Sequence, residues 1–286
     1  MRISNAMMAA NIKASLFKQN GQMYKTQEMI VSGKRINRPS DDPIGMSSVM
    51  GYRSSISSLD QYSENISQAK IRIDTAENAL EIVTELLRDA KNIAFDPDPD
   101  MRLNLAQDVA SIRDQVLQIS NYQLNGEYLF AGDLTDTAPF DAAGVYNGDN
   151  GNAEYMIGEN AQVDIAADGS AIFQGASDIF AVLDTLETEL IAGNPTGITN
   201  QITPLENAID NINTIRAQNA GDYKRLEATE NHYAYFKLNM QELMSRTEDA
   251  DLAAAIVDFQ AQQTAYESTL ATSSMIMQKS LIDFIR

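Results

Sequence analysis

The sequence contains an unbroken row of apolar residues with alternating spacings of three and four between positions 59 and 94. The row consists of Leu59, Tyr62, Ile66, Ala69, Ile73, Ala76, Leu80, Val83, Leu87, Ala90 and Ala94. Residues three and four positions apart share one face of an α-helix, so the row predicts a long helix with a single apolar stripe. A stripe of this kind is buried against other helices in the manner of a coiled coil. The chain is therefore predicted to be mainly α-helical.

A second helix is predicted immediately after the first. The sequence "FDPDPD", residues 95–100, ends the first helix because Pro97 and Pro99 lack amide donors. Asp100 is expected to cap the next helix. The apolar stripe of that helix is Leu105, Val109, Ile112, Val116 and Ile119. Since the connection is short, the two helices are expected to pack antiparallel.

A glycine-rich segment interrupts the helical pattern. Residues 131–204 hold nine of the fifteen glycines, and short β-prone runs alternate there with Asn-Gly and Asp-Gly pairs. This texture predicts a small β-rich insert of hairpins at residues 132–176. Calcium binding by Asp149, Asp164 and Asp168 is disfavoured, because the spacing differs from an EF-hand loop and turn chemistry accounts for these residues. Helical signals resume from residue 177.

Both ends of the chain read as amphipathic helices without an obvious local partner. An isolated helix gains little in water unless its apolar stripe is covered, so the ends are expected to pack against each other or against other copies of the chain. The predicted assembly interface comprises Ile3, Met7, Phe17, Tyr24, Leu252, Ile256, Phe259, Tyr266, Leu270, Met277 and Phe284.

The polar stretch "GKRINRPSDDPIGM", residues 33–46, separates the first terminal helix from the long one. Gly33 is expected to end the first helix in the left-handed conformation, and Asp42 with Pro43 is expected to begin the next. A phosphate-binding P-loop is excluded, because its upstream glycine and the Ser or Thr after the lysine are missing. The residues of this predicted helix–loop–helix signature are Gly33, Arg35, Asn37, Pro39, Asp41, Asp42 and Pro43.

The composition of the chain argues against several classes of function. The net charge is −19, yet residues 1–40 carry +6, and no Lys or Arg occurs between Arg113 and Arg216. An acidic middle segment repels phosphates, so no nucleic acid partner is expected. There are no cysteines, the single histidine lies in no metal or catalytic motif, and no P-loop, G-x-S-x-G or H-E-x-x-H sequence occurs. We therefore expect no enzyme activity, no cofactor and no metal. No apolar run is long enough for a membrane span or a secretory signal.

Several stretches resemble a known family. "SGKRINRPSDDPIGM" resembles the N-terminal signature of bacterial flagellins and hook-associated proteins, and Pro43 in place of alanine is similar to the hook-associated branch. "LNGEYLFAGD", "YNGDNG" and "MQKSLIDFI" also resemble that branch, and "RAQNAGDYKRLE" resembles the wider flagellin family. The resemblance covers both ends and the helical core.

The resemblance implies a structural component of the bacterial flagellum that forms the junction between hook and filament by coiled-coil polymerisation of its terminal helices. It implies extracellular localisation after export by the flagellar type III apparatus without a cleaved signal peptide, and terminal segments that are disordered before assembly. The implied partners are other copies of the chain, the neighbouring hook-associated protein on the hook side, flagellin on the filament side and a flagellar export chaperone.

The predicted architecture is a long, flagellin-like, coiled-coil-like helical bundle built from both halves of the chain, with a small β-rich insert. Its predicted domains are an assembly and export segment at 1–42, a bundle at 43–131 and 177–246, the insert at 132–176 and an assembly helix at 247–286. Three alternatives remain: flagellin itself, the bulk filament subunit; a cytosolic coiled-coil adaptor; and a membrane-surface role for the basic N-terminal helix.

Overall fold

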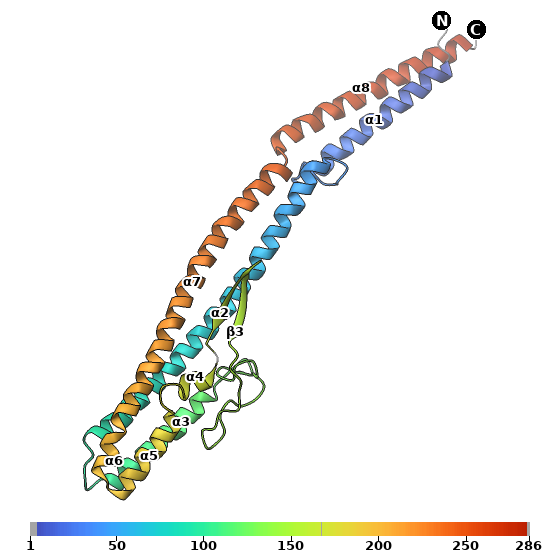
Figure 1. The fold of residues 1–286 in the computed structure, drawn as a ribbon. Helices are drawn as coiled ribbons and strands as arrows, with labels where there is room; N and C mark the ends of the chain where they lie inside the picture. Colours follow the sequence, from blue (N-terminus) through green and yellow to red (C-terminus); the bar gives the residue numbers. More distant parts are fainter. Residues whose placement is uncertain (1–4, 167, 285–286) are drawn as a thin grey trace. The chain divides into compact units, whose positions relative to one another are not determined.

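The computed structural model describes residues 5–166 and 168–284, and it is built mainly from α-helices (Figure 1). In chain order the elements are α1 (Asn5–Ser32), α2 (Pro43–Phe95), α3 (Arg102–Ser120), β1 (Gln123–Leu124), β2 (Glu127–Tyr128), β3 (Ala153–Gly158), β4 (Ala161–Ile165), α4 (Gly169–Phe173), α5 (Ile179–Ala192), α6 (Pro195–Asn200), α7 (Ile202–Glu248) and α8 (Leu252–Phe284). None of these described helices is long and apolar enough to cross a membrane. The predicted fold class, mainly α with a small β-rich insert, is confirmed.

The chain forms two compact units. The core unit is residues 59–234, and the terminal unit is residues 1–58 together with 235–286. The chain passes from one unit to the other within the long helices α2 and α7. The domain boundaries derived from the sequence stay a prediction.

The apolar row on α2 lies at the centre of the core unit. Every member from Ile66 to Ala94 is buried, as are Leu59 and the central stripe of α3. From Ala76 onward, the α2 side chains join those of α3, α5 and α7 in one large hydrophobic cluster, which an edge-to-face pair of Phe130 and Phe173 extends toward α4. Ile66, Ala69 and Ile73 belong to a second, smaller cluster. The interior therefore follows from the 3-4 spacing of the sequence.

The β insert is simpler than its turn signals predicted. Strands β3 and β4 form one antiparallel hairpin that packs on Ile66, Ile73 and Leu226 of α2 and α7. A second hairpin, of two-residue strands, lies before the predicted insert and was not predicted. It joins β1 to β2 through Asn125 and Gly126, both with positive φ, as an Asn-Gly turn favours.

Acidic side chains in and near the insert satisfy backbone amides. The Asp149 carboxylate accepts hydrogen bonds from the amides of Asp133 and Gly151, at 2.6 and 3.1 Å. Asp168 accepts from the amides of Ser170 and Ala171 and thereby caps α4. Turn and cap chemistry accounts for both residues.

The expectation that Asp100 caps α3 is wrong. Met101 occupies the N-cap position and no side chain caps the helix. Instead, the carboxylate of Asp98 accepts a hydrogen bond from the backbone amide of Asp100 at 2.9 Å, so these two aspartates interact with each other inside the turn. Aspartates in short turns also bond to nearby backbone amides, so a pattern of residue types does not decide whether such a carboxylate caps the helix.

Two neighbouring residues of α5 provide a test of this core. Leu190 is fully buried whereas Ile191 is 58% exposed. We expect Leu190→Ala to lower the free energy of unfolding of the core unit by about 2–5 kcal/mol through lost burial and the cavity it leaves. The matched change Ile191→Ala should alter it by less than about 0.5 kcal/mol. Urea unfolding followed by circular dichroism measures both, and equal effects would contradict the packing described.

Candidate functional site

The loop between α1 and α2 has the geometry expected at both of its ends. Gly33 takes a φ of 70° and its amide donates to the carbonyl of Met29 at 2.9 Å, which ends α1. At the other end, the Asp42 carboxylate accepts from the amide of Gly45 at 2.9 Å, and α2 begins at Pro43. Both predictions about this loop are confirmed.

The loop lies on the break between α7 and α8. The Arg35 guanidinium donates to the carbonyl of Thr247 at 2.8 Å, and its amide donates to the carbonyl of Glu248 at 2.6 Å. In return, the amide of Ala250 donates to the carbonyl of Gly33 at 2.9 Å. Backbone groups that α7 and α8 leave unpaired at their ends are therefore satisfied by the loop. Arg35 also forms an ion pair with Asp42 at 3.4 Å.

A buried carboxylate lies at the centre of this contact. The Glu248 side chain is only 3% exposed and pairs with Lys34 and, at 2.6 Å, with Arg53 at the start of α2. Burial by itself would raise the pKa of Glu248, but the hydrogen bonds and charges of Lys34 and Arg53 outweigh it and hold that pKa below its ordinary value. The side-chain Nδ2 of Asn37 donates to the carbonyl of Lys34 at 3.0 Å.

The remaining signature residues tie the loop to α1. Arg38 pairs with Glu28 at 3.0 Å, and its amide donates to the Asp41 carboxylate at 3.0 Å. Asp41 in turn pairs with Lys25 at 3.2 Å, whereas Pro39 is exposed in the turn. These pairs are at the surface, where solvent screens the charges, so they orient the loop more than they stabilise it.

Helices α1 and α8 lie side by side and antiparallel (Figure 1). Gln19 donates to Thr269 at 3.2 Å and Thr26 donates to Gln262 at 3.2 Å, which fixes the register. The facing residues repeat with 3-4 spacing. They are Ile12, Leu16, Gln19, Met23, Thr26 and Ile30 on α1, and Ala255, Phe259, Gln262, Tyr266, Thr269 and Ser273 on α8. Five of these twelve residues are polar, namely Gln19, Thr26, Gln262, Thr269 and Ser273.

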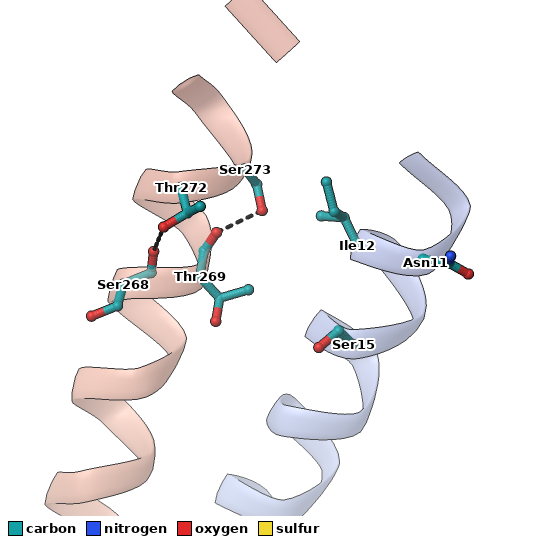
Figure 2. Close-up of a pocket in the computed structure, with 7 residues that line it drawn as sticks. All are labelled: Asn11, Ile12, Ser15, Ser268, Thr269, Thr272 and Ser273. Carbon is teal, nitrogen blue, oxygen red and sulfur yellow. Dashed lines mark hydrogen bonds between the residues drawn. The ribbon is translucent and has the colours of Figure 1, made fainter. Parts of the chain in front are cut away.

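The seam is loosely filled toward the far ends of the helices. Figure 2 shows Ile12 and Ser15 of α1 across from Thr269, Thr272 and Ser273 of α8. These residues line an open groove of about 440 Å³. Small hydroxyl side chains in place of large apolar ones leave this space, so the pair gains little apolar burial there.

The structure separates the predicted assembly residues into two groups. Phe259 and Tyr266 are half-buried in the seam between α1 and α8. The exposed group consists of Met7, Phe17, Tyr24, Leu252, Ile256 and Leu270. Ile3 lies outside the described residues, and the side chains of Met277 and Phe284 lie outside the described part of α8. Their role in assembly stays a prediction.

Sequence reasoning missed the residues that hold the terminal unit together. Glu248 stands among other acidic residues without a distinguishing motif, and its burial follows only from the tertiary position of Lys34 and Arg53. Thr26 and Gln262 were missed because a search for apolar stripes discards polar residues. The signal that could have identified Thr26 and Gln262 is a second set of positions with 3-4 spacing, which runs beside the set of mainly apolar residues on each helix.

The arrangement has the features of a structural site. Among the described residues, no group of three or more His, Asp or Glu side chains is placed to hold a metal ion. The groups brought together are cations, a carboxylate and backbone carbonyls that satisfy one another. This chemistry fixes chain geometry.

The known proteins that this chain is similar to are flagellar proteins. Residues 3–135 match the family model of the bacterial flagellin N-terminal helical region. The chain is 26% identical to flagellar hook-associated protein 3 of Salmonella typhimurium over 100% of both chains. It is 28% identical to a flagellin of Bacillus subtilis, over 91% of this chain and 90% of that one. The crystal structure of the flagellar junction protein of Legionella pneumophila has the same fold, with a TM-score of 0.57 and 14% identity over 70% of this chain and 100% of that chain.

Acid should loosen the contact around Glu248. Because its pKa is lower in the folded chain than in the unfolded chain, its ion pairs stabilise the fold fully above the ordinary value of 4.5. That stability is lost as the pH falls through the folded pKa, below 4.5. We expect the amides of Arg35 and Ala250 to keep their hydrogen-exchange protection between pH 7 and 5 and to lose it once the pH falls through the folded pKa, below 4.5, measured by NMR and corrected for intrinsic rates. Protection that persists in acid until the core unit itself unfolds would contradict this assignment.

Proposed function

We infer that this chain, a relative of flagellar hook-associated protein 3 within the flagellin family, is a structural component of the bacterial flagellum. We propose that it forms the junction between hook and filament, without enzymatic activity. The match to the Salmonella typhimurium protein along the whole of both chains supports the first statement. The second draws on the hook-associated form of the Asp41–Pro43 signature.

The uncovered apolar face of the terminal helices carries the assembly part of this proposal. On α1, the apolar residues Met7, Phe17 and Tyr24 lie outside the seam with α8 and are exposed, Phe17 by 67%. On α8, Ile256, Leu270 and Met275 are likewise exposed. Fully burying a large apolar side chain contributes about 1.5–3 kcal/mol, so a second copy that covers this face would gain substantial stability.

The two units differ in how much they depend on a partner. Both hydrophobic clusters found among the described residues belong to the core unit. The buried apolar side chains described in the terminal unit are Ile36, Val49 and Ala255. The core unit can therefore fold by itself, whereas the terminal helices need neighbouring copies for full stability.

The proposed partners follow from a position between the hook and the filament. These are further copies of the chain within the junction, the neighbouring hook-associated protein on the hook side and flagellin on the filament side. We also propose export through the flagellar type III apparatus with the help of an export chaperone, and a final location outside the cell. Weakly folded ends are compatible with such export.

Limited proteolysis tests the difference between the units. We expect chymotrypsin to cut the free chain first at exposed aromatic residues of the terminal helices, Phe17 and Tyr24 among them, and to leave the core unit intact. Mass spectrometry of the fragments identifies the cuts. Early cleavage within the core unit, or resistance of both terminal helices at low protein concentration, would favour the rival of a preassembled coiled-coil adaptor.

A charge on the uncovered face tests assembly. Leu270→Asp places an unpaired charge where a neighbouring copy is proposed to pack, so we expect normal export and an unchanged melting temperature but at least a tenfold loss of filament-bearing hooks. The matched variant Thr264→Asp adds the same charge at an exposed polar position of α8 and should be nearly silent. Electron microscopy counts the filaments. A functional Leu270→Asp protein would remove this face from the mechanism, and a lowered melting temperature would place Leu270 in the folded core.

Flagellin is the second candidate, because the sequence identity of this chain to the Bacillus subtilis flagellin, 28%, is close to its identity to the Salmonella typhimurium protein, 26%. Immunogold labelling of intact flagella separates the two. We expect label at one short zone beyond the hook. Label along the whole filament would identify a flagellin instead.

A further inference from the structure

One face of the core unit leaves large apolar side chains half exposed. Ile71 and Ile82 of α2 are 51% and 49% exposed, and Tyr122, which follows α3, is 52% exposed. We define the neutral face as six residues of α2 and of the segment after α3, namely Ile71, Thr75, Asn78, Ile82, Tyr122 and Leu124. We propose that a second copy of this chain packs on the neutral face.

The neutral face contains two hollows that follow one another along α2. The first, of about 290 Å³, lies between α2 and the β1–β2 hairpin and has Ile71 and Leu124 in its walls. The second, of about 190 Å³, is lined by Thr75 and Ile82 of α2 and by Tyr122. The side chains that contribute most to binding are usually buried in pockets of this kind near the centre of an interface. The face therefore has the shape to receive side chains of a partner.

A buried arginine fixes the shape of the neutral face in the single chain. Arg72 of α2 is only 4% exposed, and its guanidinium donates to the carbonyl of Leu129 at 2.9 Å and to that of Tyr128 at 3.5 Å. Both acceptors are backbone groups at the end of the β1–β2 hairpin, so Arg72 holds this hairpin against α2. A preformed surface loses little conformational entropy when a partner binds.

The composition of the neutral face differs from that of its surroundings. Exposed acidic residues flank it on α2, namely Asp74, Glu81 and Glu85. The charged side chains that line the two hollows are Arg72 and Glu127, which have opposite signs. Protein interfaces are depleted of charged residues at their centre and enriched in tyrosine, and the neutral face shares both features.

The charge of the chain favours a second copy as the partner. Two copies each carry a net charge of −19, so their acidic surfaces repel one another. They can approach closely only where acidic side chains are few, as on the neutral face. A basic partner would instead be attracted to the acidic side chains and would gain nothing from their absence.

The two copies meet through different surfaces. If the neutral face of one copy packed on the same face of another, a closed dimer would form and no further copy could join through it. A head-to-tail contact leaves one neutral face free for the next copy and continues into a ring or a helix. This arrangement rests on the proposed function of an assembly with many subunits, whereas the contact between two copies can be measured without any flagellum.

Photo-crosslinking of the purified full chain tests the contact. The photoreactive residue p-benzoylphenylalanine replaces Tyr122 in one variant and Ile191 in the control, because Ile191 of α5 is 58% exposed but lines neither hollow. The terminal helices are the same in both variants, so any contact that they make contributes equally. We expect covalent dimers whose yield rises with protein concentration and is several-fold higher from position 122 than from position 191. Mass spectrometry then identifies the surface that each site reaches.

A single added charge tests why the face is neutral. Asn78→Asp keeps the size of the side chain and places a negative charge on the neutral face, and Asn207→Asp makes the same change at an exposed position of α7. Asn78 is exposed, so the melting temperature should stay that of the parent. We expect Asn78→Asp to lower the dimer yield from position 122 several-fold, since a charge there is repelled and desolvated, and Asn207→Asp to leave the yield unchanged. Ile82→Asp repeats the test at a second position.

The outcomes separate the contact from the proposed function. Equal yields from positions 122 and 191, or an unchanged yield in Asn78→Asp, would overturn the neutral face as a contact. Crosslinks that join position 122 only to the neutral face of the other copy would overturn the head-to-tail arrangement. In isolated flagella, a crosslink from position 122 to another copy supports the proposal, whereas crosslinks only to a different flagellar protein would overturn a second copy as the partner. Crosslinked dimers in solution from a chain that is absent from flagella would support the contact and overturn the proposed function.

Discussion

Burial of apolar surface is concentrated in one part of this chain, and the rest of the structure depends on that imbalance. The stripe of α2 and the facing side chains of α3, α5 and α7 are removed from water within a single unit. Because the hydrophobic effect is roughly proportional to the buried apolar area, the core unit holds most of the folding free energy. The terminal helices keep large apolar residues such as Phe17 and Val31 in water, and this surface is available to a partner.

The terminal unit is organised by polar groups instead. Hydrogen bonds such as Thr26 to Gln262 have directions, so they select one register, but each contributes only about 0.5–1.5 kcal/mol net. Polar residues at seam positions of coiled coils likewise set register at a cost in stability. A subunit with such a seam has a defined arrangement of its ends and little stability in them. Both properties fit the structural role in an assembly that is proposed for this chain.

The prediction from sequence succeeded where one interaction repeats many times. Each residue of the α2 stripe confirms its neighbours, so the long helix and its buried face did not depend on any single residue. The ends of the signature loop were equally predictable, because a left-handed Gly33 and a capping Asp42 are local requirements of the backbone. The cap of α3 failed for the opposite reason. An aspartate before a helix is only a candidate cap, and here the backbone of the turn puts Met101 at the N-cap position while Asp100 donates its amide to Asp98.

The sequence by itself determined the long helices, the presence of a small β-rich insert, the acidic composition and the presence of two amphipathic ends, since all of these follow from local periodicity and composition. It did not determine which of the two registers on α1 faces α8, because the paired register contains polar residues that a hydrophobic pattern ignores. Nor did it single out Glu248, whose burial and lowered pKa arise only when Lys34 and Arg53 are brought to it from distant parts of the chain. A charge pair that joins distant segments has no periodicity, so only the tertiary structure decided it.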